Sequence, residues 1–280
     1  MPIRVFEIAC VVIVVATLAA MSRRAAPRAL LADYALLAAA AWIGEESCVA
    51  IYRFYAYGAQ WDARLLDVPV LVPLIWPLVI LSARDVATGL RPSATGLARA
   101  ALVGAVVAFD ASMVEVVAVR AGLWSWAERG HFDVPPIGIL GWGFFALGAE
   151  LVLARARGAA RLATLLVAPL VAHALILASW WGLFRWALRG DLGRASLVGF
   201  VTIAATCALL AALAKRRGDG IPLGVAGPRV LAAGLFFVLL VRVAPRDPGL
   251  WTQVACVALT YSIATRWRAP RGSRAGASSP

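Results

Sequence analysis

The chain has 280 residues, of which 62% are hydrophobic and 15% are charged, and its formal net charge is +12. A soluble domain of this length carries more charge and interrupts its apolar runs more often, so the composition indicates an integral membrane protein. The basic residues form short clusters between apolar stretches and no single patch. This pattern argues against nucleic-acid binding and is typical of cytoplasmic loops in membrane proteins.

Apolar segments recur along the whole chain and predict an all-α, polytopic transmembrane bundle. The segments are 5–21, 30–52, 68–83, 97–119, 136–154, 162–184, 196–214, 228–244 and 250–265. Several are shorter than the ~20 residues that span a bilayer, so we expect eight or nine spans. We see no internal repeat, and we expect residues 1–265 to form one transmembrane domain. The segment 266–280 is basic and rich in Gly, Ser and Pro, which predicts a disordered cytoplasmic tail.

Charge around the spans predicts their orientation. The first apolar segment follows Arg4 and precedes Arg23, Arg24 and Arg28. A cleaved signal peptide fits this pattern, but the heavier charge behind the segment favours a retained helix with its N-terminus outside. Nine spans then place 17 Lys and Arg inside against 10 outside, including a cytoplasmic loop at 215–222. We expect a bacterial inner-membrane protein with a cytoplasmic C-terminus.

Acidic residues inside the apolar segments are the candidate functional groups. Glu45 and Glu46 lie late in the second span, Asp110 and Glu115 lie in the fourth, and Glu150 lies in the fifth. Carboxylates are costly in hydrocarbon, so they usually face the bundle interior and mark a function. A neutral acid in an apolar pocket can deliver a proton to a substrate. Residues five apart are ~140° apart around a helix, so Asp110 and Glu115 must point in different directions.

A purely structural role for these acids is the alternative. Membrane carboxylates also pair with arginine to hold helices together, and Arg53 or Arg120 could serve as such partners. In the third span, prolines at 69, 73 and 77 predict a distorted helix, which either opens room for a ligand or shapes packing.

Aromatic residues gather in two loops on the expected outer side. The sequences YRFYAYGAQW at 52–61 and GLWSW at 122–126 read either as an interfacial aromatic belt or as a lid over a pocket. Aromatic faces stabilise nearby cations, which would help a reaction that forms a carbocation. The candidate substrate-binding residues are Tyr55, Tyr57, Trp76, Trp124, Trp126 and Trp142.

The sequence shows no recognisable cofactor-binding motif. The four cysteines stand singly, there are two histidines, and no GxGxxG or GxxxxGK[ST] motif is present. We therefore expect any enzymatic activity to need no metal, nucleotide or redox cofactor.

Several motifs follow one another along the middle of the chain, namely Glu45-Glu46 before YRFYAY, Val68-Pro69 before LIWPL, AFD at 108–110, GLWSW at 122–126 and VPPIGILGW at 134–142. Their order and spacing resemble the CruF-type carotenoid hydratase family of membrane carotenoid biosynthesis proteins. The resemblance implies addition of water to the terminal double bond of an acyclic carotenoid end group, without a cofactor. Asp110 is the leading acid, and Glu115, Glu46 and Glu45 are the other candidates for the catalytic set.

Two other functions fit the same residues. A carotenoid cyclase would use the same protonation and end in ring closure, whereas a proton-coupled transporter would use the carboxylates as an ion relay. The expected partners are the lipid bilayer, a carotenoid or isoprenoid substrate, and other enzymes of the pigment pathway.

Overall fold

The computed structural model describes residues 3–23, 26–188, 191–217 and 221–266. The expected tail from residue 267 onward and the centre of the expected cytoplasmic loop, 218–220, lie outside the described residues. Within these ranges the chain is mostly helical, which confirms the all-α fold class.

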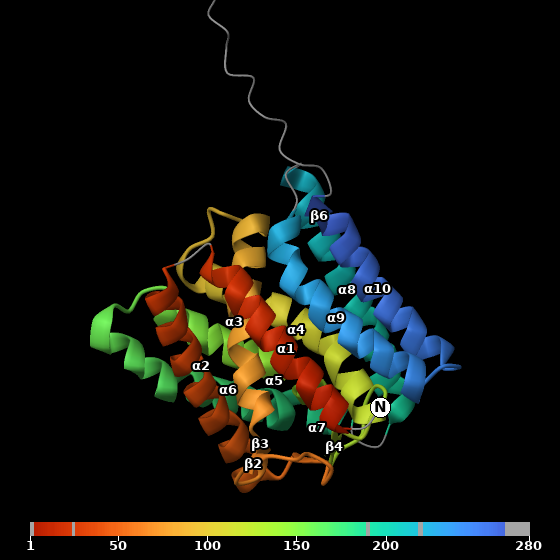
Figure 1. Ribbon diagram of the computed structural model, residues 1–280. Coiled ribbons are helices and arrows are strands. Elements are labelled where there is room, and N and C mark those ends of the chain that lie inside the picture. Colours follow the sequence, from red (N-terminus) through yellow and green to blue (C-terminus); the bar gives the residue numbers. More distant parts are fainter. Residues whose placement is uncertain (1–2, 24–25, 189–190, 218–220, 267–280) are drawn as a thin grey trace, which may run out of the picture.

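Nine long helices make up the described part of the bundle (Figure 1). They are α1 (Ile3–Ser22), α2 (Pro27–Ser47), α3 (Leu71–Leu90), α4 (Gly96–Arg120), α5 (Pro136–Leu153), α6 (Thr164–Ser179), α8 (Leu192–Arg217), α9 (Leu223–Val243) and α10 (Pro248–Ala264). The first eight, with the short turns that extend two of them, are long and apolar enough to cross a membrane, and α10 has 17 residues. The expectation of eight or nine spans is confirmed, and the chain is an integral membrane protein.

Short elements extend or connect these helices. The π-helical turn η1 (Cys48–Tyr52) extends α2, η2 (Gly158–Ala163) is a 3-10 turn that precedes α6, and the π-helical turn η3 (Trp180–Phe184) leads into the one-turn helix α7 (Arg185–Leu188). Three pairs of very short strands complete the described structure. They are β1 (Tyr55–Tyr57) with β4 (Trp124–Trp126), β2 (Arg64–Leu65) with β3 (Val68–Pro69), and β5 (Ile221–Pro222) with β6 (Thr265–Arg266).

The third helix differs from the apolar segment that predicted it. That segment covered 68–83, whereas α3 begins three residues later and continues to Leu90. The apolar run stops at Arg84, but the helix continues past it, and the Nε of Arg84 is paired with the buried Glu150 carboxylate at 2.7 Å. Pro69 precedes the helix, and Pro77 lies inside it.

The helices α4 and α5 pack backbone against backbone. A Cβ added at Gly104 would lie 2.6 Å from the carbonyl oxygen of Gly143, and one added at Gly143 would lie 2.7 Å from that of Gly104. Small residues allow such a close approach between membrane helices. This contact fixes the relative position of α4 and α5, which carry Glu115 and Trp142.

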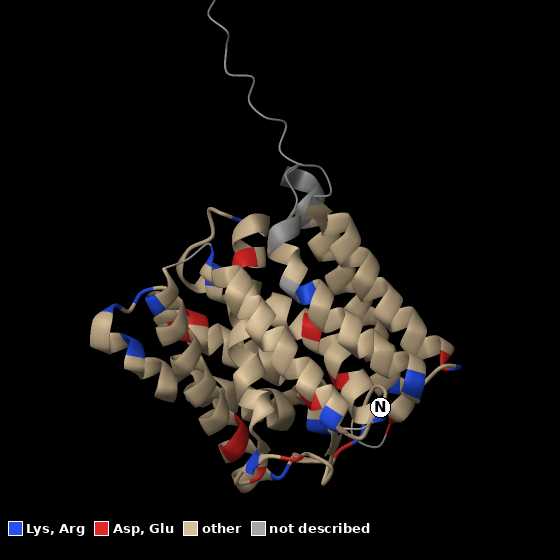
Figure 2. Cartoon of the chain, in the orientation of Figure 1, with Lys and Arg blue, Asp and Glu red and all other residues tan. Residues whose placement is uncertain are grey.

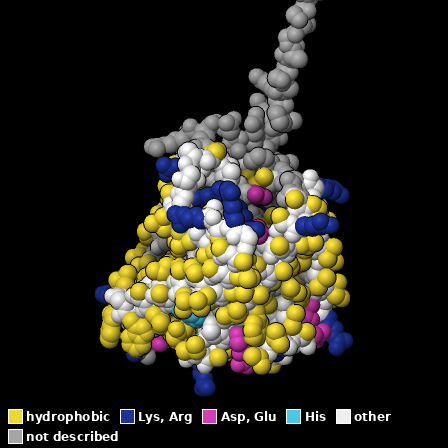
Figure 3. Space-filling model, turned by 90° about the vertical axis from the view of Figure 1, so that its left-hand side faces the viewer, with side chains coloured by type: hydrophobic (Ala, Val, Ile, Leu, Met, Phe, Trp, Pro, Cys, Tyr) yellow, Lys and Arg dark blue, Asp and Glu magenta, His cyan; other side chains and the backbone are white. Residues whose placement is uncertain are grey.

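The loops 53–70 and 121–135 meet at one end of the bundle, where β1 pairs with β4; we call it the ribbon end (Figure 1). Most charged residues lie near the two ends of the bundle, and a few acidic and basic residues lie between them (Figure 2). Figure 3 shows hydrophobic side chains over the middle of one face, with Lys and Arg gathered toward the end opposite the ribbon end. This apolar belt is the surface expected to face lipid.

Candidate active site

The ribbon β1–β4 brings two pairs of aromatic side chains to one side. Tyr55 pairs with Trp126 and Tyr57 pairs with Trp124 in the antiparallel register. Because side chains alternate along a strand, residues two apart share a face. The rings are in contact across the ribbon, with centroids 4.8 Å apart for Tyr55 and Trp126 and 6.1 Å for Tyr57 and Trp124.

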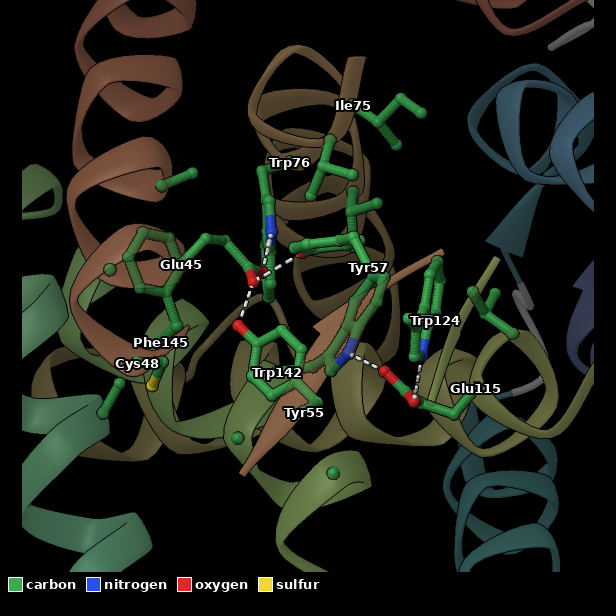
Figure 4. Close-up of a pocket in the computed structure, with 18 of the residues that line it drawn as sticks. Glu45, Cys48, Tyr55, Tyr57, Ile75, Trp76, Glu115, Trp124, Trp142 and Phe145 are labelled. Atoms are coloured by element: carbon green, nitrogen blue, oxygen red, sulfur yellow. Dashed lines mark hydrogen bonds between the residues drawn. The ribbon is translucent and has the colours of Figure 1, made fainter. Parts of the chain in front are cut away.

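This aromatic face closes a cavity of about 170 Å³ between the helices. Helices α1 to α6 and α9 all contribute to its walls, together with the ribbon. The structure places two of the expected acids, Glu45 and Glu115, and all six expected aromatic residues in the lining (Figure 4). The remaining lining is almost entirely apolar, so the cavity suits a hydrocarbon ligand.

Three aromatic donors hold the carboxylate of Glu45, which projects from α2. The hydroxyl groups of Tyr55 and Tyr57 both donate to its Oε2, the second at 2.8 Å. The indole N–H of Trp76, on α3, donates to its Oε1 at 2.8 Å. Burial raises the pKa of Tyr55 and Tyr57 well above the ordinary value, and the nearby Glu45 adds to the shift. Both tyrosines therefore stay protonated and keep donating.

Three indoles hold the carboxylate of Glu115, which projects from α4 and is fully enclosed. Trp124 and Trp126 donate to its Oε2 at 2.9 and 3.0 Å, and Trp142, on α5, donates to its Oε1 at 2.6 Å. A Cβ added at Gly138 would lie 2.7 Å from the ring of Trp126. The glycine thus leaves the space that Trp126 needs to reach Glu115.

The two carboxylates belong to one connected cluster. The rings of Trp76 and Trp142 lie against each other with centroids 4.6 Å apart, and each donates to a different glutamate. Figure 4 shows Glu45 and Glu115 on either side of this aromatic cluster. None of the described residues that line the cavity is Lys or Arg, so the cluster holds two acids without a neighbouring basic group.

Asp110, the leading acid of the sequence analysis, lies outside the cavity lining. Its carboxylate accepts hydrogen bonds from Arg229 of α9 and from the hydroxyl of Tyr261 of α10. Both charged side chains are largely enclosed, with 17% of Asp110 and 10% of Arg229 exposed. The different directions expected for Asp110 and Glu115 are confirmed, because only Glu115 faces the cavity.

Glu46 also lies apart from the cavity. It accepts a hydrogen bond from the backbone N–H of Asp67, in the loop between β2 and β3, at 3.1 Å. Neighbouring residues on a helix point ~100° apart, and here only Glu45 of the two points into the cavity.

Glu150 serves a different cluster, at the end opposite the ribbon. Its fully enclosed carboxylate pairs with Arg84 at 2.7 Å and with Arg99 at 2.9 Å. Arg120, one of the two arginines considered as a structural partner for these acids, pairs instead with Asp247 at the ribbon end, at 2.8 Å.

Several lining residues were not identified from the sequence. They are apolar or weakly polar, namely Phe6, Cys48, Phe145 and Phe236. Each lies in an apolar run, where nothing distinguishes a residue that faces a cavity from one that faces lipid. Among the described residues, no three His, Cys, Asp or Glu side chains are grouped in a way that could hold a metal ion.

Comparison with known proteins identifies one family. No curated protein and no solved structure matches the chain. The model of the carotenoid biosynthesis protein family matches residues 4–205, which hold α1 from its second residue, every element from α2 to α7 and part of α8. Glu45, Glu115 and the six aromatic residues around them all lie in the matched region. Since the match covers most of the chain, this protein belongs to the carotenoid biosynthesis protein family.

Proposed function

We propose that the protein adds water to the terminal double bond of an acyclic carotenoid end group, with Glu45 as the acid and Glu115 as its carboxylate partner. Membership of the family gives the protein a role in carotenoid biosynthesis. The observation that carries the finer proposal is a pair of carboxyl groups in an apolar cavity, each held by three aromatic donors. The apolar lining can accommodate an alkene, and a carboxyl group of the pair can transfer a proton to it.

We expect the two carboxyl groups to hold one proton between them, so that one is protonated and the other is ionised. Two ionised carboxylates in an apolar cavity would repel each other, and the described lining offers no Lys or Arg to offset their charge. The three donors on Glu115 are indoles, which donate but cannot accept, so they favour the ionised form of Glu115. Two of the donors on Glu45 are phenols, which both donate and accept, so protonated Glu45 keeps its partners.

The proposed reaction begins with proton transfer from Glu45. The electron pair of the terminal double bond forms the new C–H bond, which leaves a tertiary carbocation. Ionised Glu115 and the faces of Trp76 and Trp142 stabilise this cation. Water bonds to the cationic carbon and releases its surplus proton to Glu115, which gives a tertiary alcohol. Return of this proton to Glu45 completes a cycle that consumes one alkene and one water.

Product analysis tests this function. The protein is expressed in cells that accumulate lycopene, and the molecular masses of the extracted pigments are measured by mass spectrometry. We expect a product heavier than lycopene by one water, which carries label when the cells grow in water enriched in heavy oxygen. The control is the variant E115Q at a matched level of folded protein, for which we expect little product.

The other outcomes contradict the proposal in different ways. A product of unchanged mass with a ring would mean that the cation closes on the polyene, as in a cyclase. No change in the pigment, together with proton-dependent uptake of a solute, would mean that the carboxylates serve a transporter.

A further inference from the structure

The cavity is too small for a whole carotenoid. Its volume is about 170 Å³. An engineered cavity of ~150 Å³ in another protein holds one benzene molecule, so this one holds an end group of similar size. If the substrate is a long polyene, as the proposed function implies, the rest of the chain must leave the cavity between two helices and reach the lipid.

Helices α1 and α9 form one wall of the cavity. Phe6 and Cys10 of α1 and Ala232 and Phe236 of α9 line it. Their neighbours along the chain face outward, since Val5 is 50% exposed and Phe237 is 48% exposed. One layer of side chains therefore separates the cavity from the lipid-facing surface here.

At the level of the cavity, the contacts that the structure describes between these residues of α1 and α9 are apolar. The rings of Phe6 and Phe236 meet edge to face with centroids 6.3 Å apart. At the N-terminal end of α1, Arg4 forms an exposed ion pair with Asp62 at 3.0 Å, and the Glu7 carboxylate accepts from the Asp62 backbone at 3.1 Å. Exposed ion pairs contribute little to holding an element in place.

A second wall, between α2 and α6, is held by polar contacts. His173 of α6 hydrogen-bonds to the Ser47 hydroxyl at 2.8 Å and lies 3.7 Å from the Cys48 sulfur. Its ring also packs on Tyr52, with centroids 5.3 Å apart. A hydrogen bond in an apolar medium is costly to break without a replacement partner. Separating α2 from α6 is thus less favourable than separating α1 from α9.

We propose that the polyene leaves the cavity between α1 and α9, with Phe6 and Phe236 as the gate of this portal. This inference rests on the proposed function, because it takes a long polyene as the substrate. With the end group beside Glu45 and Glu115, the chain lies between the two phenyl rings and continues into the bilayer. The portal belongs in part to a helix outside the family match, since α9 begins after residue 205.

A matched pair of substitutions on α9 tests the portal. Ala232→Phe places a ring in the wall, whereas Gly234→Phe adds the same ring where nothing lies within 4 Å and the residue is exposed. Binding is measured by quenching of tryptophan fluorescence in lipid nanodiscs, with lycopene and with a ten-carbon acyclic terpene alkene as probes. We expect A232F to weaken lycopene binding by about tenfold or more and to leave the short alkene bound, with G234F unchanged.

Other results overturn the portal. Unchanged lycopene binding by A232F excludes this route, and loss of both probes places Ala232 against the end group itself. Should A232F fail to fold, Phe236→Ala gives the second test, and a lycopene association rate no faster than that of the wild type counts against the gate. Binding needs no turnover, so a protein that binds lycopene through this portal but adds no water refutes the proposed function alone. A protein that adds water while A232F binds normally refutes the portal alone.

Discussion

Asp110 and Glu115 are five residues apart on one helix, yet they have different surroundings. Glu115 faces the cavity and accepts hydrogen bonds from three indole N–H groups, whereas Asp110 is paired with Arg229. Asp110 is nevertheless the leading acid of the sequence analysis. Its partner is 119 residues away in the chain, so no local pattern could identify the pair. We therefore interpret Asp110 as a residue that holds helices together.

Replacing Asp110 with Asn tests that interpretation. The change leaves the charge of Arg229 enclosed without its counter-ion, which typically costs about 3 kcal/mol or more. We expect a lower unfolding temperature in detergent, but turnover per folded molecule close to that of the wild type. The double variant D110N/R229M removes both charges and should recover much of the lost stability. If D110N instead unfolds normally and loses turnover, Asp110 returns as the candidate acid.

The ribbon β1–β4 is the element that could not be predicted from the sequence. YAY and WSW each contribute three residues, too few for a period of two to stand out, and they are separated by the whole of α3 and α4. The aromatic composition of both loops indicated a lid or a belt. Only pairing in the antiparallel register places two tyrosines at Glu45 and two tryptophans at Glu115.

The loop 121–135 is anchored to the bundle through His131. Its Nε2 lies 2.7 Å from the side-chain oxygen of Gln253 in α10, and Gln253 donates to the backbone oxygen of Ser112 in α4. A Cβ at Gly199 of α8 would lie 2.6 Å from the ring, so the fit there is close. Burial lowers the pKa of His131 below its ordinary value, and the hydrogen bond to Gln253 opposes this only in part.

This anchor predicts a dependence of stability on pH. The unfolded chain takes up the proton as the pH falls below about 6.5, whereas folded His131 resists it until a lower pH. The stabilisation is thus complete above about pH 6.5 and declines below it. We expect the unfolding temperature of the wild type to fall between pH 7.5 and 5.5 more steeply than that of His131→Gln. Parallel curves for the two proteins would exclude His131 as the cause.

At the scale of the whole molecule, the number and positions of the helices could be predicted from the apolar runs. The main error was at the third span, where the apolar run stops at Arg84 but the helix continues. A charged residue ends a hydropathy segment whether or not another residue pairs with it. Here Arg84 is paired with Glu150 of another helix. Most features that could not be predicted from the sequence therefore depend on contacts between helices that are distant in the sequence.

Orientation in the membrane is a further prediction at this scale. We expect the ribbon end to face outward and η2 to face the cytoplasm, because the larger share of Lys and Arg lies on the side of η2. Single cysteines at the exposed positions Ala63 and Ala160 test this with a membrane-impermeant maleimide on intact cells. Labelling is expected at Ala63→Cys and, without lysis, not at Ala160→Cys. The reverse pattern would place the cavity at the cytoplasmic side.

The most direct test of the proposed chemistry compares two adjacent glutamates. Glu45→Gln keeps the size of the side chain but removes the proton that the reaction needs, and Glu46→Gln makes the same change one residue away, outside the cavity. We expect product formation from lycopene, per folded molecule, to fall by ~10²–10⁴-fold in E45Q. In E46Q it should stay near the wild-type level. Near-normal product from E45Q, or an equal loss in both variants, would contradict the assignment of Glu45 as the acid.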